Sequence, residues 1–174
     1  MSDLEPHYRM MVREDLPPVQ RNPVHVVLDN IRSAFNVGSI FRTADAGAVE
    51  HLHLCGYTAF PPNLKLAKTA LGAMDYVPWT HRKNIQDTLD WLEQNGIPCV
   101  AVETVPEAAG HTEFAWPQPV AVVFGNEVTG IGPEVLARCS HAVRIPMRGH
   151  KNTINVATAF GVVLFEILRQ WRAL

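Results

Sequence analysis

Short apolar runs of strand length alternate along this chain with segments whose apolar residues recur at helical spacing. The apolar runs predict strands at residues 25–29, 51–55, 76–79, 98–102, 120–124 and 142–145. The helical spacing predicts helices at residues 37–46, 64–71, 84–96 and 153–171, with a further short helix opened by a proline at position 133. This alternation predicts an open parallel α/β sheet with helices on both faces.

The two ends of the chain differ in character. Residues 1–22 are polar and contain prolines, which predicts an N-terminal arm with one short helix near residues 8–14. Residues 23–174 are expected to form a single domain, since this length suits one hydrophobic core. The last helix is expected to begin at Thr153, a good N-cap residue. Its predicted buried face consists of Val156, Ala159, Phe160, Val163, Leu164 and Ile167.

The bulk composition narrows the class of protein. Hydrophobic residues make up 47% of the 174 residues and charged residues 18%, as in ordinary soluble domains. No apolar run approaches the roughly 20 residues of a membrane span, and the N-terminus does not read as a signal peptide. The three cysteines are widely spaced in the sequence, so we expect them to be small core residues. This cysteine usage also predicts a reducing cytoplasm. The net charge of −2 excludes a strongly basic nucleic-acid binder, so any positive surface must be local.

The common nucleotide-binding motifs are absent from the sequence. The first predicted strand is followed by Asp29-Asn30-Ile31-Arg32-Ser33 instead of a Gly-x-Gly-x-x-Gly turn, and no Walker phosphate loop occurs. A cofactor would therefore bind at the glycine-containing loops of the C-terminal half, although glycine alone favours simple turns. The eight histidines lack metal-ligand spacing such as His-Glu-x-x-His, and we expect no metal.

Three polar segments, each at the end of a predicted strand, resemble motifs of a known family. Residues 30–47 resemble motif 1 of the SpoU/TrmH branch of the SPOUT-class methyltransferases, residues 123–130 resemble motif 2, and residues 145–156 resemble motif 3. The motifs stand in family order, and the likeness covers roughly residues 24–172. The resemblance implies methyl transfer from S-adenosyl-L-methionine to a ribose 2′-hydroxyl of RNA. It also implies the SPOUT fold, whose C-terminal part forms a deep trefoil knot.

The resemblance assigns catalytic roles to five residues. Arg42 would engage the phosphate and ribose hydroxyl of the target nucleotide, and Asn36 would help to position it. A bidentate grip on phosphate is physically easier for Arg42 than acting as a base, because guanidinium is almost never deprotonated in proteins. Glu127 would fix a loop or a partner arginine, or it could be a favourable charge at a helix N-terminus. Thr153 and Asn155 stand where the family usually has Ser-Leu-Asn.

Cofactor contacts in the family come largely from backbone groups of three loops. These positions correspond here to Thr104, Gly125, Ile145, Met147 and Ile154. An apolar slot with backbone hydrogen bonds suits an adenine ring. From the side chains alone, Ile145 and Ile154 could equally be ordinary core residues.

Three basic residues are candidates for RNA binding. Arg148 and Lys151 belong to a basic loop before the last helix and are expected to contact the RNA backbone. Arg32 could grip a phosphate or pair with Asp29 or Asp45, and the sequence does not separate these roles.

The sequence thus favours an RNA 2′-O-methyltransferase that forms homodimers in the cytoplasm, with no membrane or metal partner. A tRNA substrate is favoured over rRNA. Two alternatives remain open at this point. One is a noncatalytic RNA-binding or assembly protein that retains the fold, and the other is methylation of a base, against which the Asn36–Arg42 and Thr153–Asn155 pattern argues.

Overall fold

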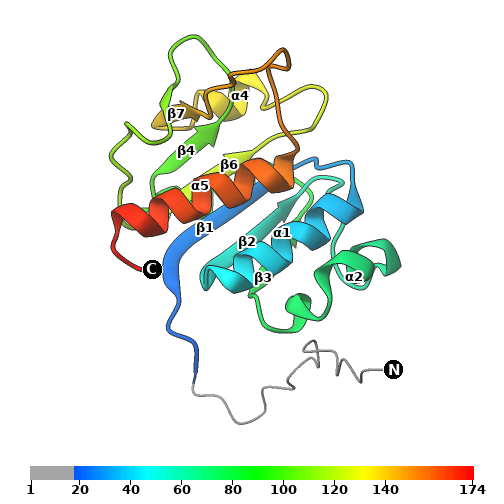
Figure 1. Cartoon of the computed structure of the whole chain (residues 1–174). Coiled ribbons are helices and arrows are strands. Elements are labelled where there is room, and N and C mark those ends of the chain that lie inside the picture. The colour runs from blue at the N-terminus through cyan, green and yellow to red at the C-terminus, as the bar shows by residue number, and fades with distance from the viewer. Residues whose placement is uncertain (1–17) are drawn as a thin grey trace, which may run out of the picture.

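Every pairing between strands in the structure is parallel, as the sequence predicts. The computed structural model describes residues 18–174, in which seven strands form one sheet in the order β3-β2-β1-β6-β4-β7-β5 (Figure 1). The strands are β1 (Asn22–Asp29), β2 (Val49–Cys55), β3 (Trp79–Arg82), β4 (Cys99–Val102), β5 (Ala109–Gly110), β6 (Val120–Phe124) and β7 (His141–Arg144). The helices are α1 (Ala34–Ala46), α2 (Leu64–Ala70), α3 (Ile85–Gln94), α4 (Pro133–Leu136) and α5 (Val156–Gln170), with a 3₁₀ turn at Ala73–Asp75.

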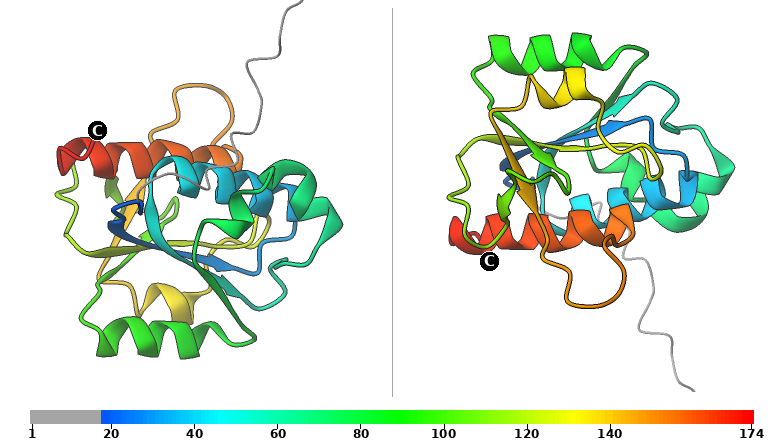
Figure 2. Two further views of the ribbon diagram at one scale, coloured as in Figure 1. Left: turned by 90° about the horizontal axis from the view of Figure 1, so that it is seen from below. Right: turned by 90° about the horizontal axis from the view of Figure 1, so that it is seen from above.

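Helices cover both faces of this sheet, which confirms the predicted architecture. Helices α1, α2 and α5 lie on one face and α3 and α4 on the other (Figure 2). Strand β1 shows how both faces are buried: Val26 and Leu28 point to the first layer and Val27 to the second. A central parallel strand covered on both faces reads as a continuous apolar run, and this is how β1 appears in the sequence.

The N-cap of the last helix lies two residues later than predicted. The N-cap of α5 is Asn155, whose side chain accepts hydrogen bonds from the backbone of Ala157 and Thr158, and not Thr153. Asparagine is at least as good an N-cap as threonine, so sequence preference alone did not exclude either position. Thr153 consequently stays in the loop before the helix, where it lines a cavity.

The strand predicted at residues 76–79 is displaced to β3. Leu71 and Gly72 adopt left-handed backbone conformations, and the 3₁₀ turn follows them directly. Pro78 then accepts a hydrogen bond from Leu52 through its carbonyl but has no N–H, so it can only start the strand. The two-residue strand β5 was not predicted, since it is too short to produce a pattern. Strand β7 lies one residue earlier than expected, which leaves Ile145 in a loop.

The described residues test only some of the remaining sequence predictions. The short helix expected near residues 8–14 lies outside the described residues, and β1 already begins at Asn22, inside the expected arm. Cys55 and Cys99 are buried, as expected for core cysteines. Within residues 18–174, no helix combines the length and apolar character needed to cross a membrane. The trefoil knot stays a prediction.

Candidate active site

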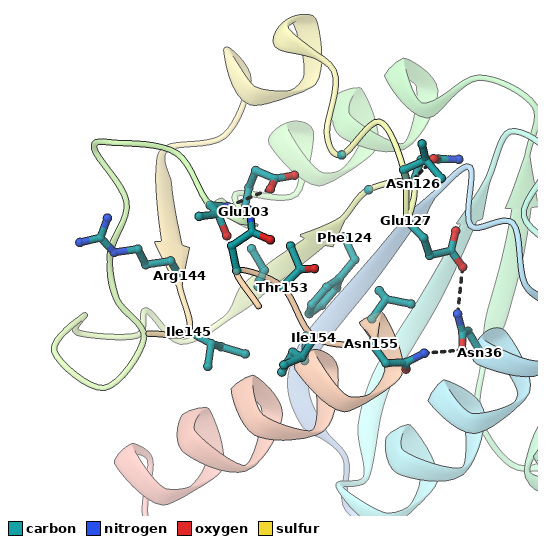
Figure 3. Close-up of a pocket in the computed structure, with 18 of the residues that line it drawn as sticks. Asn36, Glu103, Phe124, Asn126, Glu127, Arg144, Ile145, Thr153, Ile154 and Asn155 are labelled. Carbon is teal, nitrogen blue, oxygen red and sulfur yellow. Dashed lines mark hydrogen bonds between the residues drawn. The ribbon is translucent and has the colours of Figure 1, made fainter. Parts of the chain in front are cut away.

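A cavity of about 1000 Å³ opens at the carboxyl ends of β1, β4, β6 and β7. The loops that follow these four strands line it, together with the first turns of α1 and α5 (Figure 3). In the sheet, β1 lies between β2 and β6. The chain connections that leave the carboxyl ends of β1 and β6 therefore run in opposite directions at this point. Such switch points are the usual ligand sites of open α/β sheets.

Glu127 holds the loop between β1 and α1. Its carboxylate accepts hydrogen bonds from the backbone N–H groups of Arg32 (2.8 Å) and Ser33 (3.2 Å) and from Asn36 Nδ2 (2.9 Å). Burial raises the pKa of Glu127, but these hydrogen bonds outweigh burial and leave the pKa below its ordinary value. The carboxylate therefore sits ionised at the N-terminus of α1, where the helix dipole also favours it.

Asn36 connects Glu127 to the last helix. Its Nδ2 donates to Glu127, and its Oδ1 accepts a hydrogen bond of 3.0 Å from Asn155 Nδ2. The two partners both point toward Asn36 in Figure 3. Asn155 at the same time caps α5 with its Oδ1. One chain of side-chain hydrogen bonds thus joins the loops that follow β1, β6 and β7.

Asn126, which was not among the predicted site residues, organises the loop after β6. Its side chain is only 9% exposed, and its Nδ2 donates to the carbonyl of Asn30 and to the hydroxyl of Tyr57. Its Oδ1 accepts from the backbone of Val128 (2.8 Å) and Thr129 (3.0 Å). All four hydrogen-bonding positions of the amide are occupied, so Asn126 fixes the loop and has no free group for chemistry.

A second carboxylate, Glu103, lines the cavity beneath the loop after β6. It accepts hydrogen bonds from the backbone of Ile131 (3.0 Å) and Thr104 (2.8 Å), and thereby ties the loop after β4 to the loop after β6. Gly130 has a φ of +69°, and a Cβ there would lie 2.6 Å from Glu103 Oε2. A Cβ on Gly125 would lie 2.4 Å from the backbone of Gly130. Only glycines allow these loops to approach each other so closely.

The cavity brings together most of the residues selected from the sequence. All five predicted cofactor positions line it, and so do four of the five predicted catalytic residues and two of the three predicted RNA-binding residues. These are Thr104, Gly125, Ile145, Met147, Ile154, Asn36, Glu127, Thr153, Asn155, Arg32 and Lys151. Arg32 forms no ion pair with any residue of the described chain, which leaves neither Asp29 nor Asp45 as its partner.

Arg42 and Arg148 lie outside the lining of this cavity. Arg42 is exposed on α1, almost two turns beyond Asn36, and Arg148 is exposed on the loop between β7 and α5. Sequence reasoning missed Glu103, Asn126, Phe124 and Arg144 as cavity residues. Each stands at or directly beyond the end of a parallel strand, and that position alone was a usable signal. No cluster of three possible metal-binding side chains occurs among residues 18–174.

Comparison with known proteins identifies the family. Residues 23–165 match the sequence profile of the SpoU rRNA Methylase family. The chain belongs to the SpoU/TrmH family. A protein of Staphylococcus haemolyticus assigned to the TrmH family of tRNA/rRNA methyltransferases is 32% identical over 145 residues, which is 83% of this chain. The match covers 58% of that relative, so this SpoU/TrmH chain spans little more than half the length of the curated relatives it matches.

Solved structures support the same SpoU/TrmH assignment. An AdoMet-bound rRNA methyltransferase from Sinorhizobium meliloti superposes with a TM-score of 0.80 at 30% identity, covering 89% of this chain and 59% of that one. The SpoU methyltransferase AviRb from Streptomyces viridochromogenes in complex with AdoMet superposes with a TM-score of 0.81 at 27% identity. The match covers 90% of this chain and 63% of that one. A structure that concerns the 2-OH methylation of C/U34 on tRNA superposes with a TM-score of 0.78 at 29% identity. The match covers 87% of this chain and 97% of that one.

The cavity suits AdoMet (S-adenosyl-L-methionine), which two of these SpoU/TrmH neighbours carry. Its volume lies at the upper end of the roughly 300–1,000 Å³ of small-molecule sites. Ile145, Met147 and Ile154 supply apolar surface for a base, and Gly125 also lines the cavity, where a side chain would clash with the backbone of Gly130. The Glu103 carboxylate retains acceptor capacity beyond the two N–H groups that it binds, which suits sugar hydroxyls or an ammonium group.

Proposed function

We propose that this protein is an S-adenosylmethionine-dependent RNA methyltransferase that acts in the cytoplasm on a ribose 2′-hydroxyl of tRNA. The observation that carries the proposal is the hydrogen-bonded chain Glu127–Asn36–Asn155, which unites the three family motifs at the rim of one cavity. A protein that only bound RNA would have no need for so closely tied a set of side chains beside a cofactor-sized cavity.

Five residues are proposed to hold the methyl donor. Backbone groups of Thr104, Gly125 and Ile154 would hydrogen-bond the cofactor, and the side chains of Ile145 and Met147 would pack against its base. The bound cofactor supplies a methyl group activated by its sulfonium charge, so no metal is required.

The remaining site residues are proposed to position the ribose hydroxyl. Arg42 grips the phosphate of the target nucleotide in a bidentate manner, which orients the hydroxyl for transfer. Glu127 is a positioning residue, because its oxygens already accept three hydrogen bonds and its lowered pKa makes it a weak base. Thr153 lies at the cavity surface, where its hydroxyl is available to the substrate. Arg32, Arg148 and Lys151 neutralise neighbouring phosphates.

The proposed functional unit is a homodimer. Arg42 is exposed and lies outside the cavity of its own chain, so its role requires RNA that extends over α1 or a cavity from a second protomer. On the same face of the sheet, α5 leaves Val162 and Phe165 38% and 41% exposed. An interface over α1 and α5 would bury this apolar surface.

A transfer assay tests the proposed function. Purified protein is incubated with methyl-labelled S-adenosylmethionine and, separately, unmodified tRNA and rRNA, and the product is digested with alkali. Label retained in alkali-resistant dinucleotides from tRNA is expected. Label in rRNA alone would reassign the substrate, and label released as mononucleotides would move the chemistry to a base. Cofactor binding without transfer to either RNA would contradict the proposal.

A further inference from the structure

Tyr57 is an exposed aromatic side chain that is nevertheless held at both ends. It lies in the loop after β2, and 63% of its surface is open to solvent. Its hydroxyl accepts a hydrogen bond from Asn126 Nδ2, and its backbone N–H donates to Asn30 Oδ1 at 3.2 Å. Isolated exposed aromatic residues are common, but an exposed ring fixed at its tip and at its base is preorganised for contact.

The two residues that hold Tyr57 are themselves fixed. The Asn126 amide uses every one of its hydrogen-bonding positions. Asn30 adopts a left-handed backbone conformation with φ of 54°, and its Nδ2 donates to Asp29. Gly56 also adopts a left-handed conformation, and a Cβ there would lie 2.0 Å from Asn30 Oδ1. The ring is therefore carried by a support that glycine at position 56 favours, because a side chain there would strain the backbone and crowd Asn30.

The surroundings of this ring suit nucleic acid. Asn126 belongs to the lining of the proposed active site, so the ring stands at the rim of the cavity. Val128, 71% exposed, and Arg32, also exposed, line the cavity on the same rim. The nearby Asp29 is buried, and burial raises the pKa of its carboxyl. An open ring at the edge of a cavity that an exposed arginine also lines fits a stacked base followed by a phosphate.

We propose that Tyr57 is a stacking platform for the base of the nucleotide next to the one whose ribose enters the cavity. This inference rests on the proposed function, since it assumes an RNA substrate at the cavity. Stacking on an aromatic ring tolerates any base, so Tyr57 strengthens binding of an unpaired loop more than it selects a sequence. Truncation of one such ring is expected to weaken RNA binding by roughly 10-fold.

The experiment compares Tyr57→Ala with the matched control Tyr57→Phe, which keeps the ring and removes only the hydroxyl. After the methylated nucleotide has been mapped, the dissociation constant is measured for the corresponding RNA stem-loop and for stem-loops with an abasic site on either side of the target. Tyr57→Ala is expected to bind the intact RNA about 10-fold more weakly, and Tyr57→Phe within about 3-fold of wild type. One abasic substitution should weaken wild type but leave Tyr57→Ala unchanged.

Three results would overturn the inference. If wild type methylates RNA but both abasic substitutions weaken wild type and Tyr57→Ala equally, Tyr57 does not stack on either neighbour. If Tyr57→Ala alters sedimentation and leaves RNA affinity unchanged, the ring is a protein contact. If wild type binds S-adenosylmethionine but methylates no RNA, the proposed function itself fails and the inference with it. Unchanged S-adenosylmethionine affinity and circular dichroism of Tyr57→Ala establish that the variant is folded.

Discussion

Asn36 Oδ1 accepts a hydrogen bond of 3.0 Å from Asn155 Nδ2, although the two residues are 119 positions apart in the sequence. Asn36 lies in the first turn of α1, and Asn155 is the residue that caps α5. The bond therefore fixes the beginnings of two helices relative to each other. Because Glu127 binds the other end of the Asn36 amide, the orientation of Asn36 is set from both sides.

The two roles of Asn155 can be separated by substitution. Asn155→Asp keeps an oxygen that caps α5 but places a second oxygen against Asn36 Oδ1, which removes the link. Asn155→Ala loses both the cap and the link. We expect Asn155→Ala to lower the free energy of unfolding by about 1 kcal/mol and Asn155→Asp to leave it nearly unchanged. Methyl transfer should fall at least 10-fold in both. Equal activity of Asn155→Asp and wild type would show that the link is dispensable.

Glu127→Gln tests whether the carboxylate acts by positioning. The amide replaces one acceptor oxygen by a donor, which would face the N–H of Arg32 or Ser33. We expect kcat to fall by about 10²-fold while the dissociation constant for S-adenosylmethionine changes less than about 3-fold. The pH profile of the remaining activity should keep its shape, because Glu127 does not exchange a proton in the reaction. A lost limb of the pH profile would instead identify Glu127 as a base.

Gly125→Ala should damage the cofactor site specifically. The added methyl group would lie 2.4 Å from the backbone of Gly130, which cannot move without displacing the loop tied to Glu103. We expect S-adenosylmethionine affinity, measured by calorimetry, to fall at least 10-fold. Gly149→Ala is the matched control, because a Cβ there meets no atom within 4 Å. Similar affinities for the two variants would place the cofactor away from this loop.

Arg42→Ala is expected to abolish methylation while S-adenosylmethionine affinity stays within about 2-fold of wild type, since Arg42 lies outside the cavity. Arg42→Lys keeps the charge but loses the bidentate grip, so it should recover only part of the activity. Single-turnover assays at saturating RNA separate this loss from weaker RNA binding. Equal loss of cofactor affinity and activity in Arg42→Ala would contradict the proposed role.

A buried histidine pair should make stability sensitive to mild acid. His25 Nδ1 and His53 Nε2 lie 3.2 Å apart beneath α3, with His51 and Arg82 beside them. Burial and the neighbouring His51 lower the pKa of His25 to about 4 and that of His53 to about 2. The unfolded chain takes up protons near pH 6.5 and the folded chain does not, so stability decreases as the pH falls below that value.

The size of this effect follows from the two protons involved. Between pH 7 and pH 5 the free energy of unfolding should decrease by roughly 2–4 kcal/mol, measured by urea denaturation at each pH. His53→Gln removes one contributing group and should reduce the dependence on pH without abolishing it, since the pKa values of His25 and His51 are lowered too. A free energy of unfolding that stays constant over this range would contradict the buried neutral state of the pair.

The sequence predicted the layers of the fold because the spacing of the apolar residues clearly distinguishes strands from helices. The continuous apolar run of β6 and the apolar stripe of α5 were predicted correctly, because both faces of the sheet are buried. The boundaries were less accurate where backbone conformation decides them. The left-handed Leu71 and Gly72 displaced β3, and the choice between Thr153 and Asn155 as the cap depends on the tertiary contact with Asn36.

The site was predictable where a residue stands at the end of a strand within a family motif. The resemblance selected Asn36, Glu127 and Asn155, and in the structure these three residues lie together at one cavity. It did not indicate that Asn126 is fully occupied by hydrogen bonds or that Glu103 joins two loops, since both facts depend on backbone groups from distant segments. The distance of Arg42 from the cavity likewise depends on how α1 packs.

The saturated hydrogen bonds of Asn126 have a consequence for evolution and design. The amide holds the loop after β6 in place through backbone groups, which are present whatever side chains stand at positions 30, 128 and 129. Substitutions of Val128 or Thr129 can therefore reshape the cavity border while the backbone of this loop stays in place. Under the proposed function, the border that meets the target RNA is separate from the residues that would position the reacting groups, so the target could be changed without rebuilding the chemistry.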